Sequence, residues 1–322
     1  MKYRALGRSG LNVSEIGFGA WGIGGSIAGD LSYGATDDAQ SLSALEQAVD
    51  VGVCFFDTAP AYGNGHSEEL IGKALNRNRS DVVIATKGGI ERFDTAPDFS
   101  SLALTEGLNG SLKRLNTDFV DLYQLHNPPP DLLAKPEQLQ EVFASWISAG
   151  KIRALGMSVK SPEEALLAMD QFELAAVQVN FNLIDQRVLK SDLFGVAMAK
   201  GVSIIARTPL CFGFLTGLYS NDSGFLPGDH RNSWSVEQID LWAGALERFR
   251  DVISRHGDNS PAQFALRYCL SYNAVATTIP GMLNADHVND NCGASDFGPL
   301  PVADLAILQE IYQSNSFFAG TA

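Results

Sequence analysis

The sequence predicts a single (β/α)8 barrel spanning residues 1–322, and three observations lead to that fold class. Eight short apolar, β-branched runs recur along the chain without polar alternation, as expected for strands buried on both faces. Amphipathic helical stretches separate these runs. The chain exceeds the roughly 250 residues that such a barrel needs, and it contains no linker or low-complexity segment where a domain boundary would fall.

The order of the elements follows from these runs. The expected strands cover 13–21, 53–59, 81–89, 119–128, 152–159, 174–182, 202–210 and 274–281. The expected helices cover 38–52, 66–76, 100–116, 135–151, 161–171, 192–201, 236–257 with 260–271, and 284–293. Ser161-Pro162 and Ser260-Pro261 each place an N-cap serine before a proline at the first helical position. The remaining residues suit an N-terminal β-hairpin at 3–13 on the barrel floor, a long loop at 224–238 and an extra C-terminal helix at 302–314.

Composition narrows the class of protein. The formal net charge of −14 argues against nucleic acid and anionic membranes as partners. The chain has no run of 18 apolar residues and its N-terminus lacks a signal-peptide core, so we expect a cytoplasmic protein. The four cysteines are scattered, which suits reduced residues rather than a disulfide frame or metal set, and the five histidines lack ligand spacing. The oligomeric state stays open.

Polar residues stand where successive predicted strands end. Asp57 ends the second strand, Lys87 the third and His126 the fourth, and they are followed by Ser158, Gln178 with Asn180, and Arg207 on later strands. Function in such barrels gathers at the carboxyl ends of the strands. Since burying an unpaired charge is costly, these side chains are expected to pair with one another.

A proton-transfer site follows from that pairing. A tyrosine phenol is a weak acid, with an unperturbed pKa of about 10, and a nearby ammonium stabilises its phenolate. Tyr62 lies five residues after Asp57; Lys87 is the expected ammonium, and Asp57 the carboxylate that holds it. His126 is expected to hydrogen-bond a substrate oxygen. This set suits carbonyl reduction if a hydride source lies opposite.

The stretch DTAPAYG at 57–63, followed by GHSEELIGKAL, resembles the signature of the aldo-keto reductase family. Lys87 in IATKGG and His126 in DLYQLHNP are similar to its remaining active-site residues, and the resemblance covers nearly the whole chain. It implies an NAD(P)(H)-dependent oxidoreductase that interconverts aldehydes, ketones or sugars with alcohols by hydride transfer, with Tyr62 as general acid/base. The alternative is a redox-sensing regulatory subunit with the same barrel, like the channel β-subunits of this family.

The resemblance also implies where a dinucleotide binds. Ser158 and Gln178 would hold the nicotinamide carboxamide. The other predicted cofactor-binding residues are Gly19, Ala20 and Trp21 after the first strand, Arg207, then Pro209, Leu210, Gly213, Leu215 and Gly217 along the pyrophosphate, and Gly281, Leu283, His287, Asp290 and Asn291 at the adenosine end.

Three positions depart from the family pattern. Val159 stands where asparagine is usual, and Arg207 stands where a ring-stacking aromatic is frequent. Leu283 lies where many members carry Lys or Arg for the 2′-phosphate of NADP. NADP is therefore the first expectation and NAD the alternative.

Other readings of the motifs are weaker. Gly17 to Gly22 matches G-x-G-x-x-G, but it runs into a glycine-rich loop at 22–36 rather than a helix, so a Rossmann domain is not predicted. No tyrosine has a lysine four residues later, as a short-chain dehydrogenase requires. Trp21 and Trp234 suit either packing or a pocket wall. His230, in the long polar loop, is expected to be solvated.

Overall fold

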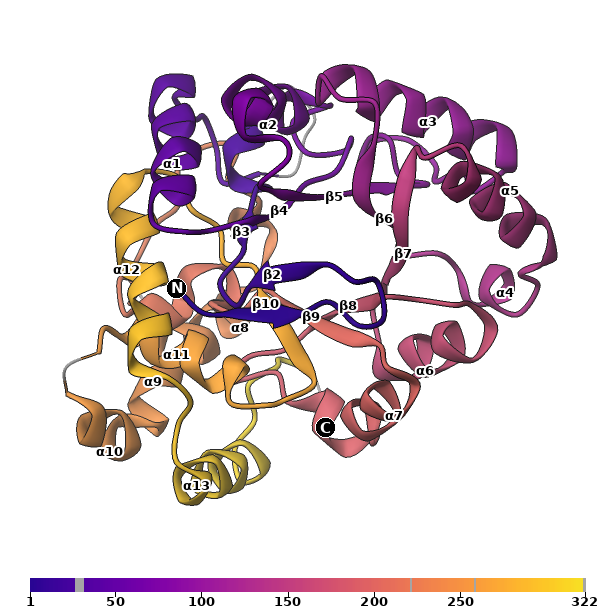
Figure 1. Cartoon of the computed structure of the whole chain (residues 1–322). Helices are drawn as coiled ribbons and strands as arrows, with labels where there is room; N and C mark the ends of the chain where they lie inside the picture. Colours follow the sequence, from indigo (N-terminus) through magenta and orange to yellow (C-terminus); the bar gives the residue numbers. More distant parts are fainter. Residues whose placement is uncertain (27–31, 221, 258, 321–322) are drawn as a thin grey trace.

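The computed structural model describes residues 1–26, 32–220, 222–257 and 259–320, so residues 27–31 of the glycine-rich loop lie outside the described part. Eight parallel strands form one sheet in the order β10-β9-β8-β7-β6-β5-β4-β3. Isolated parallel bridges join its two ends, from Ile16 to Thr278 and from Gly19 to Gly281. The sheet is therefore closed, with helices around it (Figure 1), and the predicted (β/α)8 barrel is confirmed.

All eight predicted strands are present. They are β3 (Phe18–Gly19), β4 (Phe55–Asp57), β5 (Val83–Gly88), β6 (Val120–His126), β7 (Ile152–Ser158), β8 (Ala176–Asn180), β9 (Ser203–Arg207) and β10 (Val275–Thr278). The predicted hairpin is β1 (Tyr3–Ala5) paired antiparallel with β2 (Asn12–Ser14). The first barrel strand is shorter than expected, because residues 12–14 form the second strand of the hairpin and pair with β1 instead.

The helices follow the predicted order around the barrel. They are α1 (Asp38–Asp50), α2 (His66–Leu75), α3 (Ser101–Arg114), α4 (Pro130–Leu133), α5 (Glu137–Ser148), α6 (Pro162–Gln171), α7 (Leu193–Lys200), α8 (Val236–Ala243), α9 (Ala245–Arg248), α10 (Arg250–Ile253), α11 (Pro261–Leu270), α12 (Ala285–Phe297) and α13 (Val302–Gln313). The single helix expected at 236–257 is wrong: it breaks into α8, α9 and α10. Gly244 separates α8 from α9, where a glycine weakens a helix interior.

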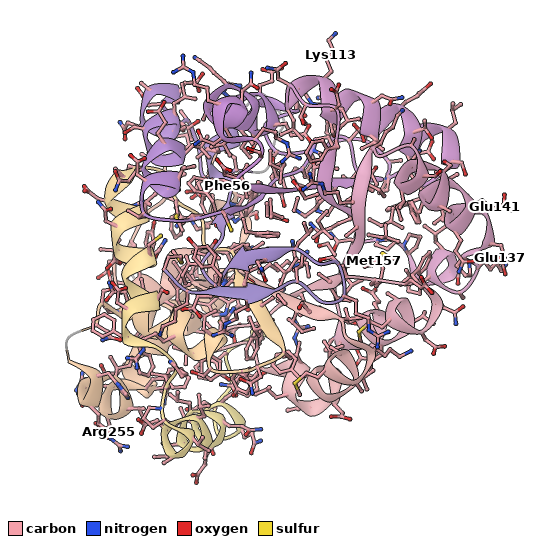
Figure 2. All side chains as sticks on the ribbon, in the orientation of Figure 1. Phe56, Lys113, Glu137, Glu141, Met157 and Arg255 are labelled. Carbon is pink, nitrogen blue, oxygen red and sulfur yellow. The ribbon has the colours of Figure 1, made fainter. Side chains whose placement is uncertain are left out.

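Strand alternation decides which side chains enter the barrel. Successive residues of a strand point to opposite faces. Phe55 of β4 and Ala85 of β5 belong to the apolar cluster that also contains Leu6 and Val13 of the hairpin, which fill the barrel floor. Asp57 and Lys87, two residues further along these strands, therefore point inward at the opposite end. Figure 2 shows side chains filling the space within and around the sheet.

Two further findings bear on the sequence predictions. Among the residues described, no helix is long and apolar enough to cross a bilayer. All four cysteines are free, and Cys211, Cys269 and Cys292 are buried, as predicted for reduced core residues.

Candidate active site

The turn after β4 holds Tyr62 over the barrel end. The Tyr62 amide donates to the Ala59 carbonyl at 3.1 Å, and α2 begins four residues later at His66. Gly63 has a φ of +60°, and a side chain there would collide with the Gly24 carbonyl. Only glycine lets these two loop backbones pass so closely. The turn is therefore fixed against the segment that follows β3.

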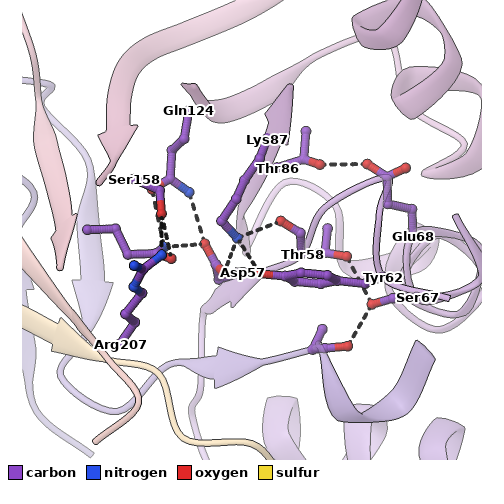
Figure 3. A network of polar contacts seen from close by, with 12 residues as sticks. Asp57, Thr58, Tyr62, Ser67, Glu68, Thr86, Lys87, Gln124, Ser158 and Arg207 are labelled. Carbon is purple, nitrogen blue, oxygen red and sulfur yellow. Dashed lines mark hydrogen bonds and ion pairs between the residues drawn. The ribbon is translucent and has the colours of Figure 1, made fainter. Parts of the chain in front are cut away.

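Lys87 is the centre of the site. Its ammonium donates to Asp57 Oδ1 at 2.5 Å, to the Thr58 carbonyl at 2.9 Å and to the Tyr62 phenol oxygen at 3.1 Å (Figure 3). Lys87 and Asp57 are only 1% and 2% exposed. Burial by itself lowers the pKa of Lys87, but Asp57 and Tyr62 outweigh it and the pKa is raised. The lysine is thus charged at neutral pH, with its three protons directed at three oxygens.

Two amides hold the other oxygen of Asp57. Gln124 Nε2 donates to Asp57 Oδ2 at 2.9 Å, and Gln178 Nε2 donates to the same oxygen at 2.7 Å. Gln124 is absent from the predicted site, although it lies two residues before His126 and so shares the inward face of β6. The Gln178 amide nitrogen is already engaged within the protein, and its predicted contact with a nicotinamide stays a prediction.

His126 is a neutral imidazole in this environment. Burial, with Lys87 and Arg207 nearby, holds the pKa of His126 well below its usual range. Its ring lies 6.1 Å from the Tyr62 ring, centroid to centroid, in an edge-on orientation. His126 Nδ1 is buried and has no hydrogen-bond partner among the described residues. A buried nitrogen without a partner is unusual in a native protein and marks a place where a ligand can bind.

Arg207 crosses from the end of β9 to the end of β7. It donates to Asn180 Oδ1 at 2.7 Å, Ser158 Oγ at 3.0 Å, the Val159 carbonyl at 2.9 Å and Asn127 Oδ1 at 3.3 Å. These four bonds fix its guanidinium against the strand ends. A role of Arg207 in cofactor binding stays a prediction.

Aromatic side chains surround Tyr62. The Trp21 ring lies 6.4 Å from it and the Phe93 ring 6.4 Å, measured between centroids. Phe93 also lies 6.3 Å from His126, and Trp21 lies 4.7 Å from His230. Trp21 therefore borders the cluster that Tyr62 and His126 form with Lys87 and Asp57. Trp234, the other tryptophan left open by the sequence, packs on His230 at 5.1 Å.

The expectation that His230 is solvated is wrong. Its amide donates to the Ser32 carbonyl at 2.8 Å, and its Nδ1 lies 2.9 Å from the same oxygen. Burial lowers the pKa of His230. The neighbouring Arg231 explains why this polar loop turns inward: it pairs with Asp229 at 2.6 Å and lies 4.9 Å above the Tyr33 ring. These contacts fasten the loop after β9 to the segment after β3.

A buried ion pair next to the site was not predicted from the sequence. Glu68 of α2 is fully buried, accepts from Thr86 Oγ1 at 2.5 Å and pairs with Arg114 Nε at 2.7 Å. Thr86 directly precedes Lys87, so this contact fixes α2, and the turn that carries Tyr62, to β5. Ser67 adds a second link. Its hydroxyl oxygen lies 2.9 Å from Thr58 Oγ1, and its hydroxyl donates to the Ala20 carbonyl at 2.8 Å.

The predicted cofactor residues gather at the same end of the barrel as Tyr62. Ser158 and Arg207 end β7 and β9, and Gln178 lies two residues before the end of β8. Gly19 ends β3, and Ala20 and Trp21 follow it. The residues after β9, in and around η4 (Cys211–Thr216), are Pro209, Leu210, Gly213, Leu215 and Gly217. Gly281 and Leu283 follow β10, and His287, Asp290 and Asn291 lie in the first two turns of α12. Asp290 accepts from Ser260 Oγ at 3.0 Å, and Asn291 is buried. Their binding roles stay predictions.

Fold and site together define a (β/α)8 barrel with an acid–base cluster at the carboxyl ends of its strands. The chain belongs to the aldo/keto reductase family, whose family model matches residues 15–313. Proteins of this family are oxidoreductases that use NAD(P)H and act on small-molecule carbonyls. The family resemblance read from the sequence is therefore confirmed.

Individual relatives differ in what they are named for. The chain is 35% identical over 301 residues to the aldo-keto reductase YhdN of Bacillus subtilis (strain 168), covering 88% of this chain and 87% of that protein. It is 32% identical to a probable voltage-gated potassium channel subunit beta of Oryza sativa subsp. japonica, covering 93% of each. The holo form of the aldo-keto reductase AKR11C1 from Bacillus halodurans superposes with a TM-score of 0.79 at 26% identity, covering 100% of both chains.

Proposed function

We propose that this protein is an NAD(P)(H)-dependent oxidoreductase that interconverts a small carbonyl compound and its alcohol, with Tyr62 as the general acid and base. The observation that carries the proposal is the 3.1 Å contact in which the buried Lys87 ammonium donates to the phenol oxygen. That contact leaves the proton of the phenol free for a carbonyl oxygen. It also supports the phenolate that remains after the proton has moved.

Each of the four residues contributes one part. Asp57 keeps Lys87 charged and in place through its 2.5 Å ion pair. Lys87 stabilises negative charge on the Tyr62 oxygen. His126, neutral because burial and the nearby cations lower its pKa, can donate a hydrogen bond to the substrate oxygen without adding a positive charge. When bound, the dinucleotide supplies or accepts the hydride.

The residues present fit a dinucleotide. A neutral imidazole with an unpartnered Nδ1 lies beside the acid–base pair, and two glycines with positive φ, Gly213 and Gly217, follow β9. Such glycines turn backbone N–H groups toward phosphates and allow close approach. Gly281 faces open space, since an added Cβ there would meet no described atom within 4 Å. Ser158 and Gln178 would hold the carboxamide.

The charge near the adenosine end favours NAD, the alternative cofactor, over NADP. Residues 281–297 contain no Lys or Arg and three aspartates. Burial lowers the pKa of His287 despite Asp286 and Asp290, so that imidazole is neutral at pH 7 and grips a phosphate weakly. A 2′-phosphate would meet Leu283 and carboxylates rather than a cation. A ribose 2′-hydroxyl carries no such penalty.

Two measurements test the proposal. Intrinsic fluorescence quenching with NADH and NADPH in parallel measures whether either cofactor binds, and which binds more tightly. Tyr62→Phe should keep cofactor affinity and lose about 10²- to 10⁴-fold in turnover of an aldehyde, ketone or sugar panel. Tyr3→Phe, an exposed tyrosine on the barrel floor, is the matched control and should keep turnover. Full turnover by Tyr62→Phe would refute the assigned role.

A redox-sensing regulatory subunit is the second candidate. It is favoured by the 32% identity, over 93% of each chain, to the probable potassium channel subunit beta of rice. Such a subunit would bind the cofactor but turn over substrates slowly, and it would need a stoichiometric partner. Co-purification of the full chain from its own cells separates the two candidates: a membrane partner at equal stoichiometry, together with turnover close to zero, supports the subunit.

A further inference from the structure

Within the part of the chain that the structure describes, the Arg207 guanidinium forms no ion pair with a carboxylate. Its four hydrogen bonds go to the Asn180 and Asn127 amide oxygens, the Ser158 hydroxyl and the Val159 carbonyl, all of them neutral. Within the described residues, no Asp or Glu oxygen lies within 4.0 Å of its guanidinium. A half-buried guanidinium ordinarily pairs with a carboxylate. An unpaired one this close to a catalytic cluster therefore needs an explanation.

A continuous line of hydrogen bonds joins Arg207 to Tyr62 (Figure 3). Arg207 donates to Ser158 Oγ at 3.0 Å, and Ser158 Oγ lies 3.5 Å from Gln178 Oε1. Gln178 Nε2 donates to Asp57 Oδ2 at 2.7 Å. The line then passes through Asp57 Oδ1 and Lys87 to the phenol oxygen of Tyr62.

The charges along this line do not balance. Lys87 and Arg207 are positive, Asp57 alone is negative, and His126 is neutral because burial, Lys87 and Arg207 lower its pKa. The buried cluster thus has one negative charge too few. In a water-poor environment an imbalance of this kind acts over a longer range than it would at the surface. An anion formed inside the cluster would restore the balance.

The other charged groups that face the cluster are already committed. The acidic groups that act on Arg207 are Tyr62, Asp57, Asp185 and Glu164. The cations that act on Tyr62 are Lys87 and Arg207. Asp185 is held by Arg187 through bonds of 2.8 and 2.7 Å. Glu164 accepts from the neutral Lys160 amide at 2.7 Å and is only partly buried, so solvent screens its charge. The anion that balances the cluster is therefore one that catalysis itself produces.

We propose that Arg207 is the second cation of the catalytic cluster and that it stabilises the ionised form of Tyr62 and the oxyanion of the bound substrate. Arg207 acts through the charge of the cluster rather than by touching the reacting atoms. In the oxidation direction, which rests on the proposed function, the phenolate removes the hydroxyl proton of the alcohol and becomes phenol. The dinucleotide, when bound, would accept the hydride from the carbon that carries this hydroxyl, and that carbon would become the carbonyl carbon.

Direct titration of Tyr62 tests this inference without any substrate. The ultraviolet absorbance of tyrosinate is followed against pH in the whole protein, and the curve of a matched Tyr62→Phe variant is subtracted. In Arg207→Gln the Tyr62 midpoint should move to higher pH by about one unit, the lower end of the range for a nearby charge. Arg207→Lys keeps the charge and should leave the midpoint close to that of the unmodified protein.

A second variant neutralises the charge of Arg207 by changing one of its hydrogen-bond partners. Asn180→Asp replaces the amide oxygen, 2.7 Å from Arg207 Nε, with a carboxylate of nearly the same shape. It should also move the Tyr62 midpoint to higher pH, so the inference can be tested even if Arg207→Gln does not fold. Unmoved midpoints in Asn180→Asp, or equal shifts in the Gln and Lys variants, would overturn the inference.

The pH profile of turnover separates the inference from the proposed function. For alcohol oxidation the acidic limb should move to higher pH in Asn180→Asp and Arg207→Gln, and stay in place in Arg207→Lys. If the tyrosinate midpoint moves but neither the unmodified protein nor any variant turns over substrate, the charge effect stands and the proposed function fails. If turnover is normal and neither the limb nor the midpoint moves, the proposed function stands and the role of Arg207 is refuted.

Discussion

Replacing Lys87 with methionine should destabilise the protein as well as inactivate it. The substitution keeps much of the side-chain volume but leaves the Asp57 carboxylate, 2% exposed, without its cation. Removing one partner of a buried ion pair costs about 3–5 kcal/mol, because the remaining charge is buried and unpaired. Two amide donors stay on Asp57 Oδ2, at 2.9 and 2.7 Å, and they offset part of that loss. We therefore expect a decrease of about 3 kcal/mol in the free energy of unfolding.

A double-mutant cycle shows whether the unpaired charge is the cause. Asp57→Asn combined with Lys87→Met removes both charges, so the double variant should lose less than the sum of the two single losses, with a coupling of at least about 1.5 kcal/mol. Urea unfolding at pH 7 followed by tryptophan fluorescence measures all four proteins. Lys200→Met is the control, since Lys200 pairs with Asp170 at 3.5 Å on the surface and should contribute less than about 1 kcal/mol. Additive losses in the cycle would refute this reasoning.

Three further predictions concern pH, backbone space and cofactor choice. His126 stays neutral in the folded protein but binds a proton in the unfolded chain below about pH 6.5, so the free energy of unfolding falls as the pH falls. His126→Gln should make this dependence weaker by about 1.4 kcal/mol per pH unit. Urea unfolding between about pH 5 and 7 measures it. Equal slopes would contradict it. Gly281→Ala should change stability by less than about 0.5 kcal/mol, since the added methyl meets no described atom within 4 Å, yet it should weaken dinucleotide binding in a fluorescence titration. Unchanged affinity would place the cofactor elsewhere. Leu283→Lys should improve NADPH affinity relative to NADH by about tenfold, and an unchanged ratio would show that Leu283 lies away from the 2′ position.

The fold could be predicted from sequence because its signals are local and repeated. Apolar runs that do not alternate indicate strands covered on both faces, and eight of them separated by amphipathic stretches leave few other architectures. The long helix at 236–257 failed for a local reason as well. Its apolar periodicity continues across Gly244, but glycine is a weak helix former and α8 ends there.

The position of the cluster of Asp57, Lys87 and His126 could be predicted because strand register determines it. Asp57, Lys87 and His126 end neighbouring strands, and parallel strands bring their carboxyl ends to one rim. Gln124 could have been found by the same rule, since period-two alternation puts it on the face of His126. Glu68 could not, because an acidic residue on an amphipathic helix is normally solvated and only the fold brings Arg114 to it.

The positions of the loops depend on contacts that have no pattern along the sequence, and this limits what the sequence predicts about the substrate. The loop that carries His230 is polar in composition, yet Arg231 draws it inward by pairing with Asp229 and by lying over the rings of Tyr33, Tyr219 and Phe225. None of these contacts has a spacing or a period that could be read along the chain. Asp57, Lys87 and His126 lie on strands, whereas Trp21, which borders this cluster, packs on His230 of the loop at 4.7 Å. The reaction class can therefore be predicted from the residue types at the strand ends. The choice of carbonyl compound depends on loop contacts between residues far apart in the sequence, which only the folded protein shows.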